Sequence, residues 1–420
     1  MSTQQSEYAV QMSRYFLRPI GLWSSSSSSR SQAYLHNLLN LLLIVITYLL
    51  IMFILVPCAL HTFIEEPNMA IKMKLIGPMS FALMAVTKYA SLTQKTAVIA
   101  QCFRHVEEDW ESGCAMEKKV MYRHAKIGRS LSIFSGIFMY GGGIFYHGIM
   151  PMAAVQTFSA SIDGSLSLNT SSVFEVAKKP RILTFPTYNA WLNIEISPIY
   201  EIVYLLQCFS GYVLDTITVG TCSLAAVFVT HTCAQLELVM MLIRRYIDGD
   251  VGPDDVPYPK DATTREARLA VIVTRHIRAL KFAARVEKYL NGICFVEFIG
   301  CTMNICFIGY YCLTEWERKE PISTTTYFIL LASFTTNIFI FCYIGELLTE
   351  QCTRVGSIYH AIDWYNLPGK SASDLFFIIA ISRYPAKLTA GKFVDLTLVT
   401  FSNVMKSAFT YFNLIRTVII

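Results

Sequence analysis

The sequence predicts an all-α membrane protein with seven transmembrane helices, and three observations support this fold class. Of the 420 residues, 54% are hydrophobic and only 15% are charged, whereas soluble domains carry about 25% charged residues. The apolar residues gather in seven stretches of roughly 20 residues, the length that a helix needs to cross the hydrocarbon layer. Lys and Arg concentrate in alternate connecting segments. The composition also excludes a disordered chain and, with a net charge of only +5, a DNA-binding module.

The predicted spans follow one another along the whole chain. They cover residues 33–57, 73–93, 127–149, 198–229, 289–313, 325–348 and 393–418. The chain is thereby divided into a cytoplasmic N-terminal segment (1–32), spans one to four (33–232) with a long outer loop (150–197), cytoplasmic helices with their loop (233–290), spans five and six (291–348), further cytoplasmic helices (349–392) and the last span (393–420). The polar first 32 residues contain no cleavable signal, so we expect the first span to direct insertion.

The distribution of Lys and Arg predicts an inverted topology, with the N-terminus cytoplasmic and the C-terminus extracellular. One set of segments, which includes the N-terminus, holds 25 of the 35 Lys and Arg residues, and the alternate loops hold seven. Positive residues remain in the cytoplasm, and an odd number of spans places the two termini on opposite sides. The sequon at Asn169 then lies outside, where it can be glycosylated. None of the twelve cysteines lies in a predicted outer loop, so we expect free thiols.

Several helices are predicted to extend beyond the membrane. The pattern of residues 263–288 alternates basic and apolar residues at helical spacing and runs directly into the fifth span. About 50 residues of continuous helix would measure about 75 Å, more than twice the hydrocarbon thickness. We expect these projecting helices to pack together in the cytosol as an anchor region. A basic, apolar helix of this kind also suits lipid headgroups or calmodulin, although mutual packing explains the same pattern.

The last span carries a polar stripe on one side of the helix. At 100° per residue the stripe contains Thr400, Asn403, Ser407, Thr410 and Tyr411, and it ends toward the outside in Leu414, Thr417 and Val418. Small polar residues on one face of a membrane helix indicate either contacts between helices or a water-filled lumen. The length of the stripe favours the lumen, and the apolar end resembles a gate that closes by dewetting. One helix cannot enclose a conduit, so several chains must each contribute one.

Two basic residues in this span have other expected roles. Arg416, on the face opposite the stripe, can extend to the lipid headgroups. Lys406 lies about 80° from the stripe and either flanks the lumen, pairs with a neighbouring subunit or faces a vestibule widened toward the cytoplasm.

Aromatic and Met residues with isolated polar groups predict a binding site for a small volatile molecule inside the bundle. The candidates lie in the second, third, fourth and sixth spans and are Met84, Lys88, Tyr89, Phe134, Phe138, Tyr200, Tyr204, Phe334 and Asn337. Core packing is the alternative interpretation for each aromatic residue. Lys88 is the most unusual, because an ionisable residue within a membrane is functional unless it is paired. Glu201, Asp215 and Glu297 are its possible partners.

No catalytic, metal-binding or cofactor-binding pattern is present. The eight His residues form no His-x-x-x-His pair, no Cys-x-x-Cys occurs, and no glycine loop could hold a phosphate. We therefore expect neither an enzyme nor a bound cofactor. The rival classes are a secondary transporter or membrane-bound enzyme, which would show internal repeats, and a metabotropic receptor, which the charge distribution opposes.

Several motifs resemble those of the insect odorant receptor family. They are Leu17-Arg18-Pro19-Ile20-Gly21-Leu22-Trp23, His276-Ile277-Arg278, Cys342-Tyr343-Ile344-Gly345-Glu346 and, most specifically, Ser407-Ala408-Phe409-Thr410-Tyr411-Phe412-Asn413-Leu414-Ile415-Arg416. The resemblance implies a heterotetramer with a shared coreceptor in the plasma membrane of sensory neurons. It further implies an odorant-gated, nonselective cation channel whose last helix lines the pore.

Two departures from related patterns refine this resemblance. The sister gustatory family, which is the alternative assignment, ends its last helix in Gln-Phe where this chain has Thr417 and Val418. The coreceptor has a much longer second cytoplasmic loop than the short stretch 248–260, so the resemblance implies a ligand-tuning subunit. By position Leu414 and Val418 match the family's apolar gate, and Thr417 stands where the coreceptor type has Gln.

Overall fold

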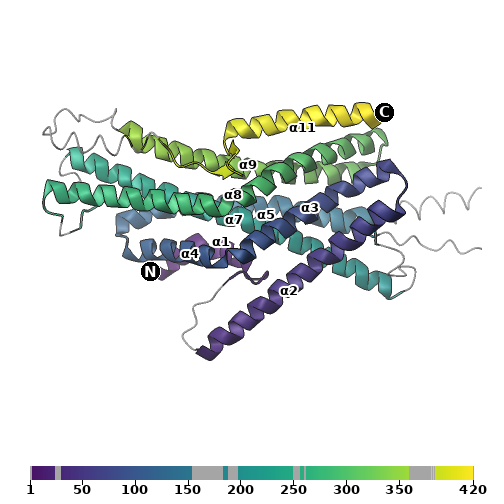
Figure 1. The fold of residues 1–420 in the computed structure, drawn as a ribbon, viewed down its shortest axis with the longest axis horizontal. Coiled ribbons are helices and arrows are strands. Elements are labelled where there is room, and N and C mark those ends of the chain that lie inside the picture. Colours follow the sequence, from purple (N-terminus) through teal and green to yellow (C-terminus); the bar gives the residue numbers. More distant parts are fainter. Residues whose placement is uncertain are drawn as a thin grey trace, which may run out of the picture.

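The computed structural model describes an almost entirely helical protein (Figure 1). The described residues are 2–23, 30–153, 183–187, 197–248, 256–259, 262–358, 380, 382 and 384–419. The elements in order are α1 (Ser2–Leu17), α2 (Arg30–Leu60), the π-helix η1 (His61–Glu65), α3 (Met69–Gln94), α4 (Thr96–Ser112), α5 (Ala115–Ile144), the π-helix η2 (Phe145–Ile149), α7 (Ile199–Asp248), α8 (Arg265–Glu317), α9 (Pro321–Ser357), β1 (Thr389–Ala390), β2 (Val394–Asp395) and α11 (Leu398–Ile419). The predicted sequon at Asn169 lies outside the described residues.

Helix α7 forms the centre of the bundle. It contacts α1, α2, α3, α5, α8 and α9, and every residue in its most apolar 18-residue stretch is buried. The burial continues beyond the predicted fourth span, because Leu236 and Leu242 are also almost fully covered. Burying a Leu side chain away from water is worth about 1.5–3 kcal/mol. The extension of α7 is therefore held by tertiary packing.

Six helical segments among the described residues are long and apolar enough to cross a membrane. They are Tyr34–Glu65, Ile71–Gln94, Ala115–Ala153, Ile199–Ile247, Arg265–Glu317 and Pro321–Ser357. They correspond in order to the first six predicted spans. The seventh predicted span forms α11, a helix of 22 residues, which is not among these six segments.

The longest helices extend well beyond a membrane's thickness. Helix α7 has 50 residues and α8 has 53, which correspond to about 75–80 Å. Helix α8 runs without interruption from Arg265, where the side chain of Thr264 accepts a hydrogen bond from the Ala267 amide at 3.2 Å and caps the helix. The two long helices lie side by side in Figure 1, with α1 and α4 against the same end of the bundle.

A short hairpin returns the chain to the bundle before α11. Strand β1 pairs with β2 in antiparallel fashion, and the turn places Gly391 and Lys392 at φ 64° and 62°. The helix therefore begins at Leu398 and not at 393 as predicted, because Val394 and Asp395 belong to the hairpin. At Gly345 of α9 a β-carbon would overlap the carbonyl oxygen of Leu396, so only glycine permits this close approach.

All twelve cysteines lie within the described part of the chain, and all are free thiols, as predicted. Most are buried and serve as small hydrophobic residues.

Candidate functional site

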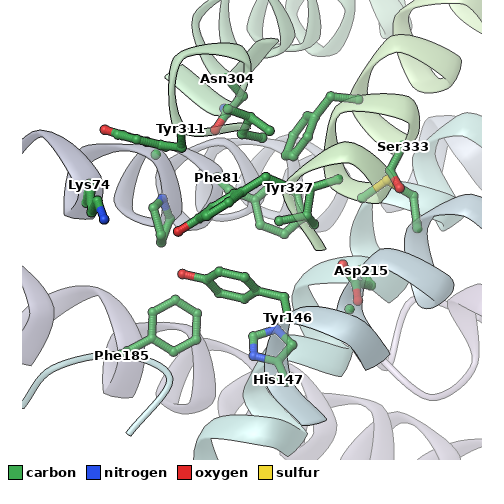
Figure 2. Close-up of a pocket in the computed structure, with 17 residues that line it drawn as sticks. Lys74, Phe81, Tyr146, His147, Phe185, Asp215, Asn304, Tyr311, Tyr327 and Ser333 are labelled. Carbon is green, nitrogen blue, oxygen red and sulfur yellow. The ribbon is translucent and has the colours of Figure 1, made fainter. Parts of the chain in front are cut away.

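A mainly apolar cavity lies inside the bundle, between α3, η2, α7, α8 and α9 (Figure 2). It contains about 670 Å³ of atom-free space, including its open mouth. Aromatic rings form much of the wall, and they come from Phe81, Tyr146, Phe185, Tyr311, Tyr327 and Phe334. Their edges and faces pack against each other, as in the T-shaped pair of Phe81 and Phe334 with ring centroids 5.3 Å apart.

The π-helix η2 brings two of the wall residues into position. It carries Tyr146 and His147, and π-helical turns occur frequently at functional sites. The preceding glycines let α5 approach its neighbours, because a β-carbon at Gly143 would overlap a carboxylate oxygen of Asp215.

Phe185 reaches the cavity from the short described segment 183–187. The side chain of Gln207 holds this segment in place, since it accepts a hydrogen bond from the Phe185 amide at 3.2 Å and donates one to the Phe185 carbonyl at 2.8 Å. The Phe185 ring then lies against both Tyr146 and His147, with centroids 6.1 and 5.5 Å apart. A backbone segment distant in sequence thus completes one side of the cavity.

The polar groups of the cavity differ in whether the protein satisfies them. Lys74 donates to Glu315 at 2.7 Å, and Asn304 donates to the Gly300 carbonyl at 2.8 Å. In contrast, the Nδ1 atom of His147 and the hydroxyl of Tyr311 are buried without a hydrogen-bond partner among the described residues. The cavity can therefore offer polar contacts to a small, otherwise apolar molecule.

The structure places one of the nine predicted ligand residues, Phe334, directly on the cavity wall. Three others lie behind the wall. Met84 accepts a hydrogen bond from Asn304 at 3.6 Å, Tyr204 donates to the His147 carbonyl at 2.8 Å, and Tyr200 stacks on Tyr204.

Phe134 and Phe138 form a T-shaped pair on α5, with the Phe134 ring 46% exposed on the outer surface of the chain. Neither residue lines the cavity.

Lys88, Tyr89 and Asn337 make internal contacts instead. Lys88 is fully buried, and its ammonium donates to Glu297 and to Thr218, each at 2.9 Å. Asn337 also donates to Glu297, so Glu297 is the partner that sequence reasoning left undecided. Tyr89 donates to the carbonyl of Ile20 at 2.7 Å and thereby holds the chain that follows α1.

Helix α11 packs along one edge only. Val404 and Ala408 are buried against the bundle, and the Phe401 ring contacts Phe339 of α9 with centroids 5.4 Å apart. The predicted stripe lies on the other side and is exposed at Asn403, Ser407, Thr410, Tyr411, Leu414 and Thr417. Figure 1 shows α11 along one side of the molecule, where the described part of this chain does not cover its polar face. The side chains of Arg416 and Val418 are outside the described set.

Sequence reasoning missed several cavity residues. Phe81 and Tyr146 stood out only as members of aromatic-rich spans, and Asp215 only as a possible partner of Lys88. His147 carried no signal, because its position depends on a π-helical turn that periodicity does not reveal. Phe185 could not be found either, since it lies outside every predicted span.

Comparison with known proteins identifies the family. Residues 121–409 match the family described as 7tm Odorant receptor. Odorant receptor 13a of Drosophila melanogaster is 23% identical over 265 residues, which cover 58% of this chain and 59% of that protein. Odorant receptor 85c of the same species is 20% identical over 344 residues, 81% of both chains.

Solved structures show the same fold. The insect olfactory receptor OR5 from Machilis hrabei, in complex with eugenol, superposes with a TM-score of 0.76 at 14% identity and covers 99% of both chains. The structure of OR5 described without eugenol gives a TM-score of 0.73. These relatives are receptors and not enzymes, in agreement with the sequence prediction. With more than half of its length matched by the family, this chain is a member of the insect 7tm odorant receptor family.

Proposed function

We propose that this chain is the ligand-tuning subunit of an odorant-gated, nonselective cation channel that it forms with a coreceptor as a heterotetramer. The observation that carries the proposal is the exposed polar face of α11. A row of hydroxyl and amide groups that the described part of this chain leaves uncovered is less favourable against lipid than against water, and it suits a water-filled conduit shared between subunits. The packed edge at Val404 and Ala408 fixes that face outward from its own subunit.

The ligand in this proposal is a small volatile hydrophobic molecule in the cavity between α3, η2, α7, α8 and α9. Six aromatic rings can surround it, while His147 and Tyr311 offer polar contacts. The related OR5 structure contains eugenol, a molecule of this class. Binding would be transmitted through α9, because this helix contributes Phe334 to the cavity and Phe339 to the contact with α11.

Orientation and location complete the proposal. The excess of Lys and Arg in the segments on the N-terminal side supports a cytoplasmic N-terminus, a C-terminus outside and α11 as the seventh span. The site of action would be the plasma membrane of sensory neurons. The short loop 248–260 supports the ligand-tuning role over that of the coreceptor.

Whole-cell recording from cells that express this chain with a coreceptor tests the proposal. A panel of volatile odorants should include at least one compound that evokes a cation current absent from cells with the coreceptor alone. Failure of every compound, with both proteins verified at the cell surface, would argue strongly against the proposal.

A matched pair of variants tests the cavity. Phe334→Ala removes a wall residue and should raise the half-maximal odorant concentration by about tenfold, since pocket contacts of this size are worth about 1–3 kcal/mol. Phe134→Ala makes the same truncation on the outer surface and should leave the response unchanged. Equal responses from the two variants would exclude this cavity as the odorant site.

A further inference from the structure

A second hollow lies between α5 and α9, separate from the odorant cavity. It consists of two adjoining cavities that share Arg123 and Ile127. The first is lined by Leu131, Phe339 and Tyr343 together with Arg123, Lys126 and Ser130. The second combines several basic residues with Met and Leu side chains. Their atom-free volumes are about 760 and 1170 Å³, open mouths included. Together they form a groove that we call the α5–α9 groove.

The groove changes from apolar to polar along its length. On α9, the residues Phe339, Tyr343, Leu347, Gln351 and Arg354 follow one another every three or four positions and so share one face of the helix. The 16 residues from Phe339 to Arg354 span about 22 Å of helix. The apolar end lies within the sixth predicted span, and the polar end lies beyond it. This gradient matches a membrane lipid, with acyl chains at one end and a headgroup at the other.

The polar end carries an excess of positive charge. Arg123 and His124 both pair with Glu237, and Arg354 pairs with Glu350 at 2.8 Å. Arg244 lines the same cavity, and Lys126 lines the adjoining one. Neither has an ion pair with any residue that the structure describes. Basic pockets between membrane helices on the cytoplasmic side suit anionic lipid headgroups.

Two buried polar atoms of residues that line this cavity have no hydrogen-bond partner among the described residues. They are Nδ1 of His124 and Oε1 of Gln351, whose residues are only 4% and 6% exposed. His124 uses Nε2 to contact the Glu237 carboxylate at 2.7 Å, so in the neutral ring Nδ1 is an acceptor, as is Oε1 of Gln351. A buried acceptor without a donor costs about 1–3 kcal/mol. A small rotation of either side chain toward the groove would let a hydroxyl or ammonium group of a ligand donate to its free acceptor.

We propose that the α5–α9 groove binds an anionic glycerophospholipid of the inner leaflet, one whose headgroup combines a phosphate with hydrogen-bond donors. The phosphate contacts the arginines, the donors reach His124 and Gln351, and an acyl chain lies along Phe339 and Tyr343. The site also touches the pore helix of the proposed channel, because the Phe339 ring stacks on Tyr343 and packs on Phe401 of α11. The lipid stabilises the contact between α9 and α11.

Native mass spectrometry of the detergent-purified full chain tests this site. Phosphatidylserine and phosphatidylcholine with identical acyl chains are titrated separately, and a soluble glycerophosphoserine headgroup serves as the tail-free probe. We expect one phosphatidylserine to bind with about tenfold preference over phosphatidylcholine. The headgroup alone should bind much more weakly than the complete lipid. Equal affinity for the two lipids, or headgroup binding as tight as that of the lipid, would overturn the proposal.

A charge-matched pair of double variants locates the binding. Arg244→Gln with Arg354→Gln should abolish the preference for phosphatidylserine, whereas Arg104→Gln with Lys281→Gln removes two exposed basic residues elsewhere and should retain it. Equal loss of the phosphatidylserine preference in both double variants would contradict the assignment. So would a groove variant that purifies as a dissociated oligomer while the wild type and the control variant stay assembled. If the groove variant does not fold, a wild-type preference that persists unchanged from low to high salt would overturn the role of the basic residues.

Discussion

Lys88 shows how a charge can be accommodated inside the bundle. Its ammonium and the Glu297 carboxylate are 2.9 Å apart, with both side chains no more than 1% exposed. Thr218 and Asn337 supply further hydrogen bonds to the pair. The contacts join α3, α7, α8 and α9, which are the helices around the odorant cavity. The pair therefore acts as a structural connection beside the site.

Removing one partner of this pair should be more damaging than removing both. Lys88→Met leaves Glu297 buried and unpaired, which costs about 3–5 kcal/mol. Lys88→Met combined with Glu297→Gln leaves no charge behind and should recover most of the loss. Thermal unfolding of the purified chain, followed with a thiol-reactive dye that reports exposure of the buried cysteines, measures both variants. A double variant no more stable than the single variant would contradict this account.

A cluster around Asp109 introduces pH dependence, and both Asp109 and His105 lie on α4, outside the candidate membrane spans. Asp109 of α4 lies 3.0 Å from His231, 3.5 Å from His105 and 2.6 Å from Arg278. Burial lowers the pKa of His105, and the nearby Asp109 charge only partly opposes this effect. Burial would raise the pKa of Asp109, but the His231 hydrogen bond and the charges of His105 and Arg278 outweigh it, so the pKa is lowered.

Both shifts predict lower stability in acid. Because the folded state keeps His105 neutral, the unfolded state binds more protons as the pH falls below about 6.5. The contribution of His105 is thus lost below that pH, while that of Asp109 is lost only near and below pH 4. The unfolding temperature of the wild type should fall between pH 7 and pH 5. The unfolding temperature of His105→Phe, which preserves stacking on Phe282, should fall by less over the same range. An identical pH slope for both proteins would refute the role of His105.

At the scale of elements, α11 combines a polar face with an apolar outer end. Leu414 is 57% exposed on the side that carries Thr410 and Tyr411. In the proposed tetramer a ring of such side chains would exclude water and close the pore.

Leu414→Ser should therefore ease wetting and raise the basal current of the complex with the coreceptor. Leu398→Ser provides the control, because Leu398 begins the same helix, on the side away from the stripe, and is also partly exposed. Whole-cell recording without odorant, normalised to surface expression, compares the two. An unchanged basal current in Leu414→Ser with normal expression would remove Leu414 from the gate.

The sequence predicts the helices well, whereas it predicts the cavity wall and the partner of Lys88 poorly. Periodicity located the long helices and the polar face of α11, because burial and exposure repeat along each helix axis. The cavity wall depends on the π-helical turn at Tyr146 and His147 and on the segment of Phe185, which Gln207 holds. Those contacts arise only when distant elements meet. The partner of Lys88 was ambiguous for the same reason, since three acidic residues satisfied the pattern.

At the scale of the whole molecule, orientation decides which surfaces meet the cytosol. The anchor region and the α5–α9 groove would face the cytoplasm if positive residues remain inside. Epitopes fused to the two termini test this arrangement. The C-terminal epitope should bind antibody on intact cells, whereas the N-terminal epitope should require permeabilisation. If only the N-terminal epitope is labelled on intact cells, the chain has the opposite orientation and this prediction is wrong.

The single chain also presents a polar surface that the proposed assembly would cover. Its polar α11 face lies opposite the edge that packs on α8 and α9, and α9 connects that edge to the odorant cavity. The central claim is that the exposed face of α11 lines the pathway for ions.

Cysteine accessibility on α11 tests this claim most directly. Thr410→Cys places a thiol on the exposed stripe, and Ala408→Cys places one on the buried edge of the same helix. With the coreceptor present and an odorant applied, a positively charged methanethiosulfonate reagent should block the current through Thr410→Cys. It should leave Ala408→Cys and the wild type, with its twelve native thiols, unaffected. Block of Ala408→Cys with no effect on Thr410→Cys would contradict the account.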